Sequence, residues 1–137
     1  MLFDTGSPMM YVLTDKCDNN LCPQASKFVA QMSMTYKATD SEPLAHCYGT
    51  GCVSGTASKD KICFSEDPKS CMTGVNFLAV DEATDIDKDK FSGIVGLGPM
   101  SDEKRMPSFI EQLSGLGGVN GKDEVKPIFS FFLSNSE

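Results

Sequence analysis

Short runs of apolar residues recur along the chain and are separated by polar and turn-forming residues. Some runs alternate apolar and polar positions, which is typical of β-strands with one buried face, and others are continuous, as in fully buried strands. The pattern predicts six strands, at Met9–Leu13, Phe28–Met34, Gly51–Ala57, Val75–Val80, Ile94–Leu97 and Ile128–Leu133. Met1 to Phe3 is expected to be a further buried strand, so we expect the chain to be a fragment with residues upstream.

One segment has the features of a helix. Pro107 stands near the start of the stretch that ends at Leu113, and several glycines follow it. Proline is favoured in the first turn of a helix and glycine just beyond its end. Two polar connectors, at 81–90 and 115–126, interrupt the strands but do not resemble domain boundaries. We therefore expect a single all-β domain, dominated by strands, with one or two short helices.

Size and charge narrow the classes of function. A chain of 137 residues with 40% hydrophobic residues is long enough for one domain with a core. The formal charge of −7 and the pI near 4.6 argue against a nucleic-acid partner, because phosphates would be repelled by most of the surface. No apolar stretch reaches the roughly 20 residues that a membrane-spanning helix needs, so no membrane span is predicted.

Cysteines are frequent for a chain of this size. They fall into the close pairs Cys17 and Cys22, Cys47 and Cys52, and Cys63 and Cys71. Such pairs are typical of local disulfides formed in an oxidising compartment, although six cysteines allow many pairings and the sequence leaves the connectivity open. Zinc is the competing interpretation, but the spacings are longer than in zinc motifs and the only histidine, His46, stands alone beside a cysteine.

The sharpest local signal is the sequence Asp-Thr-Gly-Ser at positions 4–7, which follows an apolar strand. Gly6 permits a tight backbone turn, while the hydroxyls of Thr5 and Ser7 are able to hydrogen-bond a carboxylate and orient it. The simpler interpretation is an Asx-type turn that ends a strand. Taken by themselves, the four residues leave these alternatives open.

Further motifs decide between them, because the chain resembles the pepsin-like aspartic endopeptidases along nearly its whole length. Asp-Thr-Gly-Ser at 4–7 is similar to the first active-site motif of the family, and 17–22 to its small disulfide loop. The segment 48–55 resembles the flap, a β-hairpin with a glycine-rich tip that bends over bound peptide. The segment 91–98 resembles the strand beside the active-site loop, and 127–133 the strand that closes the first lobe.

The resemblance implies an endopeptidase that activates a water between two aspartates, which share one proton because two carboxylates so close cannot both ionise. It implies no cofactor and no metal. Asp4 would be one of the two aspartates, supported by Thr5, Gly6 and Ser7. Tyr48, Gly49 and Thr50 would close over the substrate, and Phe91 and Ile94 would line an apolar subsite, unless they are ordinary core residues.

A second Asp-Thr-Gly or Asp-Ser-Gly does not occur in the sequence. The resemblance therefore implies that residues 1–137 are the N-terminal lobe of a bilobal peptidase, without its first strands and its whole C-terminal lobe. The partners would be a peptide or protein substrate and the missing lobe that supplies the second aspartate. The chain alone should show little or no activity. The cysteines and the acidic charge suit the secretory pathway, the extracellular space or an acidic compartment like a lysosome or vacuole.

The sequence departs from the family at four positions. Pro8 stands where serine or threonine is usual, and Tyr11 stands where a tryptophan is common that helps to position the flap tyrosine. Cys47 and Cys52 bracket the flap tip, where the family usually has no cysteines. A disulfide between them would restrict the opening that admits substrate.

Other functions fit less well. A retroviral-type homodimer would supply the second aspartate by symmetry, but the chain is longer than such protomers and has the flap of the bilobal type. A non-catalytic peptide-binding lobe is disfavoured by the intact motif at Asp4. The acidic segment 85–89 begins like a calcium loop but lacks the required glycine. His46 beside Cys47 has no motif of a nucleophile and base around it.

Overall fold

The computed structural model describes residues 1–17, 22, 26–49, 51–86, 91–99, 106–115, 126 and 128–132. This part of the chain contains seven strands, two 3-10 turns and one α-helix. In chain order they are β1 (Leu2–Asp4), β2 (Tyr11–Leu13), η1 (Ala30–Met32), β3 (Lys37–Ala38), β4 (Leu44–Cys47), β5 (Cys52–Cys63), η2 (Pro68–Ser70), β6 (Cys71–Thr84), β7 (Gly93–Gly96) and α1 (Phe109–Gly115). The predicted strand-dominated fold is confirmed.

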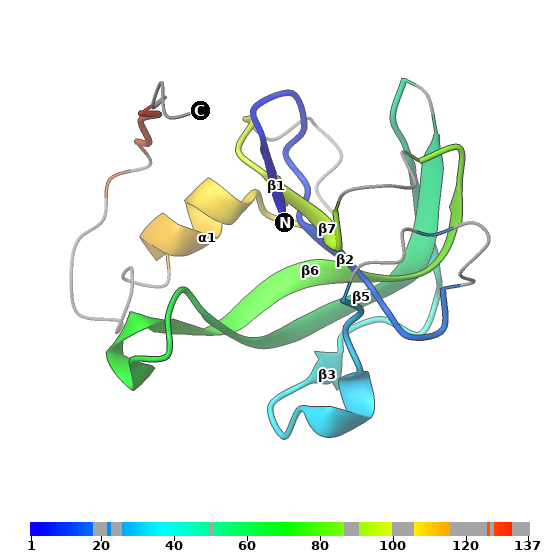
Figure 1. The fold of residues 1–137 in the computed structure, drawn as a ribbon, viewed down its shortest axis with the longest axis horizontal. Coiled ribbons are helices and arrows are strands. Elements are labelled where there is room, and N and C mark those ends of the chain that lie inside the picture. The colour runs from blue at the N-terminus through cyan, green and yellow to red at the C-terminus, as the bar shows by residue number, and fades with distance from the viewer. Residues whose placement is uncertain are drawn as a thin grey trace.

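The strands form one sheet in the order β1-β7-β2-β6-β5-β3, and β4 pairs with β5 beside this path. The two longest strands, β5 and β6, are antiparallel and form a curved hairpin that runs the width of the molecule (Figure 1). Register shifts between Ser54 and Gly55 and between Asp60 and Ile62 mark bulges in this hairpin. Bulges increase local twist, which explains how so long a hairpin curves around a core.

Strand β7 lies between β1 and β2, although about 90 residues of chain separate it from β1 and about 80 from β2. It runs parallel to β1 and antiparallel to β2, and Ile94 is the residue opposite both Leu2 and Tyr11. The segment that joins β1 to β2 must therefore pass over the end of β7. The motif at 4–7 lies in this connection.

Two apolar clusters pack against opposite faces of β6. Phe77 and Ala79 belong to one cluster, together with Phe109 and Ile110 of α1. Leu78 belongs to the other cluster. The second cluster also contains Val80, Tyr11, Leu13 and Val53, with Tyr48 and Ile94 packed against it. The alternation follows from the strand period of two, and it places Tyr11 and the hairpin β4–β5 on the same side of the sheet.

The prediction of a strand at Phe28–Met34 is wrong. Phe28 forms a single bridge to Thr14, and the chain then turns into η1. The N–H groups of Met32 and Ser33 donate to the carbonyls three residues earlier, which satisfies them within the turn and leaves no ladder to form. The prediction assumed that the apolar side chains of this segment are buried, but those of Met32 and Met34 are 82% and 100% exposed.

Two terminal predictions also need correction. Residues 128–132 form no strand and their side chains are exposed, Phe132 by 92%, because no strand among the described residues pairs with them. Leu133 and Pro127 lie outside the described residues. The strand expected at Met1–Phe3 is present as Leu2–Asp4, but it is not buried: Phe3 is 54% exposed, because β1 is at the edge of the sheet and pairs only with β7.

The remaining elements differ from expectation mainly in their bounds. Strands β5 and β6 are longer than the predicted runs, and β6 extends into the predicted charged loop as far as Thr84. The helix begins at Phe109 because Ser108 caps it: the Glu111 N–H donates to the Ser108 hydroxyl, and the Ser108 N–H donates to the Glu111 carboxylate. Most of the connector at 115–126 lies outside the described residues, as does 87–90.

All six cysteines form disulfides, and each joins a close pair. Cys47–Cys52 and Cys63–Cys71 each join directly opposite residues of neighbouring strands, with Cα atoms 4.0 Å apart. They lie at the two ends of β5. Cys17–Cys22 closes a separate loop. Local disulfides are thus confirmed, and one of them spans the hairpin of β4 and β5.

Candidate active site

Asp4 is the last residue of β1, and its side chain is held by the turn that follows. The Gly6 N–H donates a hydrogen bond of 2.8 Å to Oδ1, and the Ser7 hydroxyl donates one of 2.6 Å to Oδ2. The Ser7 side chain is buried, whereas Asp4 is half-buried. Each carboxylate oxygen therefore has a donor within the turn, and the group keeps a face open to its surroundings. Thr5 is exposed and, within the described residues, donates no hydrogen bond to Asp4.

The end of β7 fixes the backbone of this turn. The Leu97 N–H donates to the Asp4 carbonyl at 2.7 Å, and the Gly98 N–H donates to the Ser7 carbonyl at 2.9 Å. The approach is so close that a Cβ on Gly96 would lie 2.4 Å from the Pro8 carbonyl carbon. Glycine is needed there because any side chain would collide with backbone. The turn that carries Asp4 is thus clamped by a strand distant in sequence.

Tyr48 lies at the tip of the hairpin formed by β4 and β5, where its N–H donates to the Gly51 carbonyl at 2.7 Å. Its ring packs on Tyr11, with 6.0 Å between ring centroids. Burial raises the pKa of the Tyr48 phenol above its ordinary value of 10, and the neighbouring Tyr11 and the negative charge of Asp4 raise it further. The hairpin therefore brings Tyr48 into the electrostatic reach of Asp4.

The Tyr11 phenol shares this environment. Burial raises its pKa, and the charge of Asp4 adds to the effect. The Tyr48 hydroxyl is buried without a hydrogen-bond partner among the described residues. The Ser7 hydroxyl is close enough to favour ionisation of Tyr48 slightly, yet no hydrogen bond joins the two groups. A buried phenol with its donor unused is unusual, and here it lies beside a carboxylate.

The structure brings together some of the other predicted site residues. Ile94 is opposite Tyr11 and opposite Leu2, the first residue of β1, whereas Gly96 is the residue opposite Asp4. Ile94 packs against the same apolar cluster as Tyr48. Phe91 is half-buried just before β7. Gly49 is exposed at the hairpin tip, and Thr50 lies outside the described residues.

Sequence reasoning did not include three features of this site. Tyr11 was noted only as a departure from the family, although it packs on Tyr48. The amides of Leu97 and Gly98 were not foreseen as clamps of the turn. His46 was set aside, yet its ring contacts Tyr48 with centroids 4.8 Å apart. The sequence did contain a signal for this contact: His46 and Tyr48 are two residues apart, and in an extended chain such residues lie on the same face.

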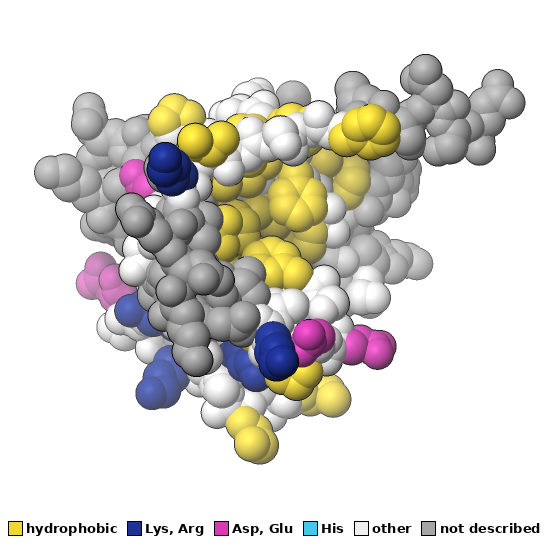
Figure 2. All heavy atoms as spheres, turned by 90° about the vertical axis from the view of Figure 1, so that its left-hand side faces the viewer, with side chains coloured by type: hydrophobic (Ala, Val, Ile, Leu, Met, Phe, Trp, Pro, Cys, Tyr) yellow, Lys and Arg dark blue, Asp and Glu magenta, His cyan; other side chains and the backbone are white. Residues whose placement is uncertain are grey.

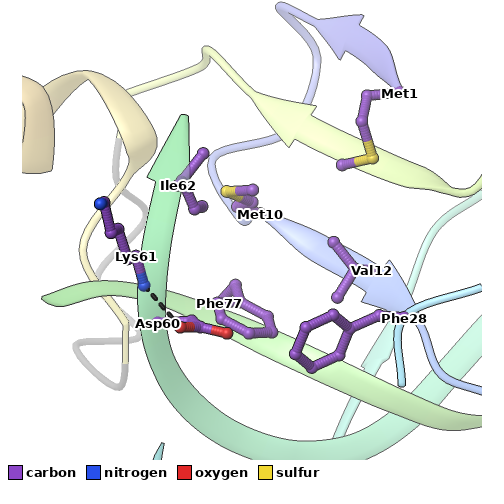
Figure 3. Close-up of a pocket in the computed structure, with 8 residues that line it drawn as sticks. All are labelled: Met1, Met10, Val12, Phe28, Asp60, Lys61, Ile62 and Phe77. Carbon is purple, nitrogen blue, oxygen red and sulfur yellow. Dashed lines mark hydrogen bonds between the residues drawn. The ribbon is translucent and has the colours of Figure 1, made fainter. Parts of the chain in front are cut away.

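An apolar recess is visible on another face of the molecule (Figure 2). Figure 3 shows a pocket whose lining includes Met10, Val12 and Phe77. Its volume is about 250 Å³. Met10 and Val12 alternate along the chain with Tyr11, and they pack with the first cluster instead of the second. The pocket therefore opens on the side of the sheet opposite Tyr11 and Tyr48, and it is not part of the Asp4 site.

An oriented aspartate thus lies at a strand end, next to a hairpin that carries a tyrosine. The family model described as eukaryotic aspartyl protease matches residues 1–137. This chain belongs to that family.

Individual relatives agree with this assignment. The chain is 31% identical to the probable aspartic-type endopeptidase CTSD of Arthroderma benhamiae over 82% of this chain and 21% of that protein. It is 32% identical to phytepsin of Hordeum vulgare over 98% of this chain and 25% of the relative. It is 39% identical to pepsin A of Bos taurus over 45% and 16%. The chain thus spans only about a quarter of the length of such relatives.

A membrane-spanning helix and a metal site each have structural requirements, and neither set is met within the described residues. No helix within them has the length and apolar character needed to cross a membrane. No three histidine, cysteine, aspartate or glutamate side chains within them come together as a metal site requires.

Proposed function

We propose that this chain is the part of an aspartic-type endopeptidase that supplies one of two catalytic aspartates, Asp4. The observation that carries the proposal is the Asp4 carboxylate, held by the Gly6 amide and the Ser7 hydroxyl beside Tyr48. A carboxylate that only ended a strand would not need a buried hydroxyl and a hairpin tyrosine next to it. Membership in the eukaryotic aspartyl protease family supports the same function.

The proposed chemistry is hydrolysis of a peptide bond by water. Two carboxylates that face each other share one proton, so that one removes a proton from the water and the other donates to the scissile carbonyl. The tetrahedral intermediate forms without a covalent bond to the enzyme. The Gly6 and Ser7 hydrogen bonds would fix the plane of the Asp4 carboxylate, so that its free face meets the water.

The substrate is a peptide or protein. Tyr48 and Gly49, together with Thr50, would cover it and exclude bulk water, because the hairpin tip lies next to Asp4. Ile94, which packs against the same apolar cluster as Tyr48, and Phe91, just before β7, would line an apolar subsite. Thr5 would support the turn through its backbone, since its side chain is exposed.

The second aspartate would come from a C-terminal lobe that is not part of residues 1–137. In this proposal the chain is an N-terminal lobe without its first strands, and alone it has little or no peptidase activity. Three disulfides suit a protein of the secretory pathway, the extracellular space or an acidic compartment like a lysosome or vacuole.

The test is Asp4→Asn in the full-length protein. Asparagine keeps the shape of the side chain but cannot act as an acid or base, so turnover of a peptide substrate at acidic pH should fall by about 10²- to 10⁴-fold. Asp60→Asn is the matched control, because Asp60 is also a carboxylate hydrogen-bonded by hydroxyls, those of Ser33 and Thr35. Its kcat/KM should stay near the wild-type value.

Two outcomes would contradict the proposal. Unchanged turnover in Asp4→Asn would favour a peptide-binding lobe without chemistry. Robust acid proteolysis by residues 1–137 alone, accompanied by a stable dimer in sedimentation, would favour a homodimeric protease in which each copy supplies Asp4.

A further inference from the structure

His46 in β4 and Tyr48, which follows the end of β4, form a ring pair in the hairpin. Their centroids are 4.8 Å apart and their planes cross at 75°, an edge-to-face arrangement that aromatic rings prefer. His46 is half-buried, and its partner across the strand pair is Val53, which is buried in the second cluster. The imidazole is therefore packed towards the core and not displayed on the surface.

The Tyr48 side chain is held mainly through its ring. Its hydroxyl is near the Ser7 hydroxyl but forms no hydrogen bond within the described residues, so no hydrogen bond fixes the direction of the side chain. Two rings contact it, Tyr11 at 6.0 Å and His46 at 4.8 Å between centroids. The Cys47–Cys52 disulfide restrains the backbone of the hairpin, but a restrained backbone can still allow more than one staggered rotamer of the side chain.

We propose that His46 is a positioning residue for the peptidase reaction, which acts by holding the ring of Tyr48 in its place against Tyr11. The two contacts have different origins: Tyr11 comes from β2 next to the Asp4 turn, and His46 moves with the hairpin itself. Tyr48 therefore keeps its orientation relative to the hairpin through His46 when the hairpin moves away from Tyr11. This inference rests on the proposed function and adds a residue to it that has no contact with the reacting atoms.

The test is a double-mutant cycle in the full-length protein, with kcat/KM measured per active site. His46→Ala should lower kcat/KM by about two- to tenfold, the effect of losing one aromatic pair. In a Tyr48→Ala background the same change should have almost no further effect, because His46 acts through the ring that has been removed. His46→Phe retains an edge-to-face ring and should restore kcat/KM to within about twofold of wild type.

Phe64→Ala serves as the matched control. Phe64 forms a similar ring contact with Phe109, with centroids 6.1 Å apart, at the opposite end of β5 from the hairpin tip. Its loss should lower the free energy of unfolding without changing kcat/KM per active site. His46→Ala would behave in the same way if His46 were only structural.

The inference is overturned if His46→Ala leaves kcat/KM unchanged, or if its effect multiplies with that of Tyr48→Ala. If either of these results is found while the Asp4→Asn variant is inactive, only the role of His46 is refuted and the proposed function stands. An active Asp4→Asn variant overturns the proposed function and this inference together.

Discussion

Ser7 holds Asp4 from within the protein: its hydroxyl donates a 2.6 Å hydrogen bond to Oδ2, and its side chain is only 3% exposed. The carboxylate it holds is half-buried. A buried donor therefore fixes one oxygen of a carboxylate that remains partly accessible.

Ser7→Ala should weaken catalysis without removing it. A hydrogen bond to a charged group contributes about 1.5–3 kcal/mol, so we expect kcat/KM to fall by roughly ten- to hundredfold in the full-length protein. Ser33→Ala is the control, because it removes a 3.0 Å hydrogen bond from a serine to another carboxylate, that of Asp60. An equal loss of kcat/KM in both variants would show that the Ser7 effect comes from general destabilisation.

The Cys47–Cys52 disulfide should limit the motion of the hairpin tip. Replacing both cysteines by serine is expected to lower the free energy of unfolding by about 2 kcal/mol, the value for a short closed loop. Amide hydrogen exchange at the tip, at Tyr48 and Gly51, should become faster.

The Cys63–Cys71 pair provides the comparison, since it also joins opposite residues with Cα atoms 4.0 Å apart. Its removal should destabilise the chain by a similar amount and leave exchange at the hairpin tip unchanged. A free thiol at Cys47 or Cys52 in a non-reduced peptide map would refute the disulfide itself.

Gly96→Ala should disturb the Asp4 turn. The new Cβ would lie 2.4 Å from the Pro8 carbonyl carbon and 2.6 Å from the Met9 nitrogen, so the backbone must move. We expect a loss of about 1–3 kcal/mol in the free energy of unfolding, measured by denaturant titration. Gly115→Ala is the control, because a Cβ there meets no atom within 4 Å, and its stability should be nearly unchanged.

Ionisation of Tyr11 and Tyr48 at alkaline pH should distinguish the folded from the unfolded chain. The pKa values of Tyr11 and Tyr48 are raised above 10, in both cases mainly by burial, so both phenols stay neutral in the folded chain as the pH passes 10. The stability from these raised values is fully present below pH 10 and is lost as the pH rises through the folded-state values. Ultraviolet absorbance should therefore show more tyrosinate in the unfolded chain than in the folded chain just above pH 10.

Tyr48→Phe tests this assignment. The variant lacks one late-ionising group, so the gap between folded and unfolded titration curves should shrink. A Tyr48 phenol that ionises together with the unfolded chain would contradict its buried position beside Asp4.

The sequence predicts the Asp4 turn because the motif is local: Gly6 and Ser7 are within three residues of the carboxylate they bind. It also predicts the hairpin of Tyr48, through the resemblance to a known family. It does not predict that Leu97 and Gly98 hold the turn, because those contacts depend on β7 entering between β1 and β2. Tertiary contacts of this kind produce no periodic pattern of apolar and polar residues in the sequence.

The errors have physical causes. Met32 and Met34 look like strand residues because hydropathy does not distinguish an exposed methionine from a buried one. Ile128 and Phe132 look like a strand, but a strand needs a partner, and none of the described strands pairs with them. The start of the helix, by contrast, was predictable from the sequence, because Ser108 followed three residues later by Glu111 is a capping box. The prediction relied on Pro107 instead and did not use this motif.

The insertion of β7 between β1 and β2 has a consequence for biosynthesis. Asp4 is made at the beginning of this chain, but the strand that clamps its turn follows only after about 90 further residues. Pairings between such distant segments form slowly, since a long loop must close before they contribute. The acid therefore emerges from the ribosome well before its surroundings exist, and its turn cannot be clamped until Leu97 and Gly98 have been translated.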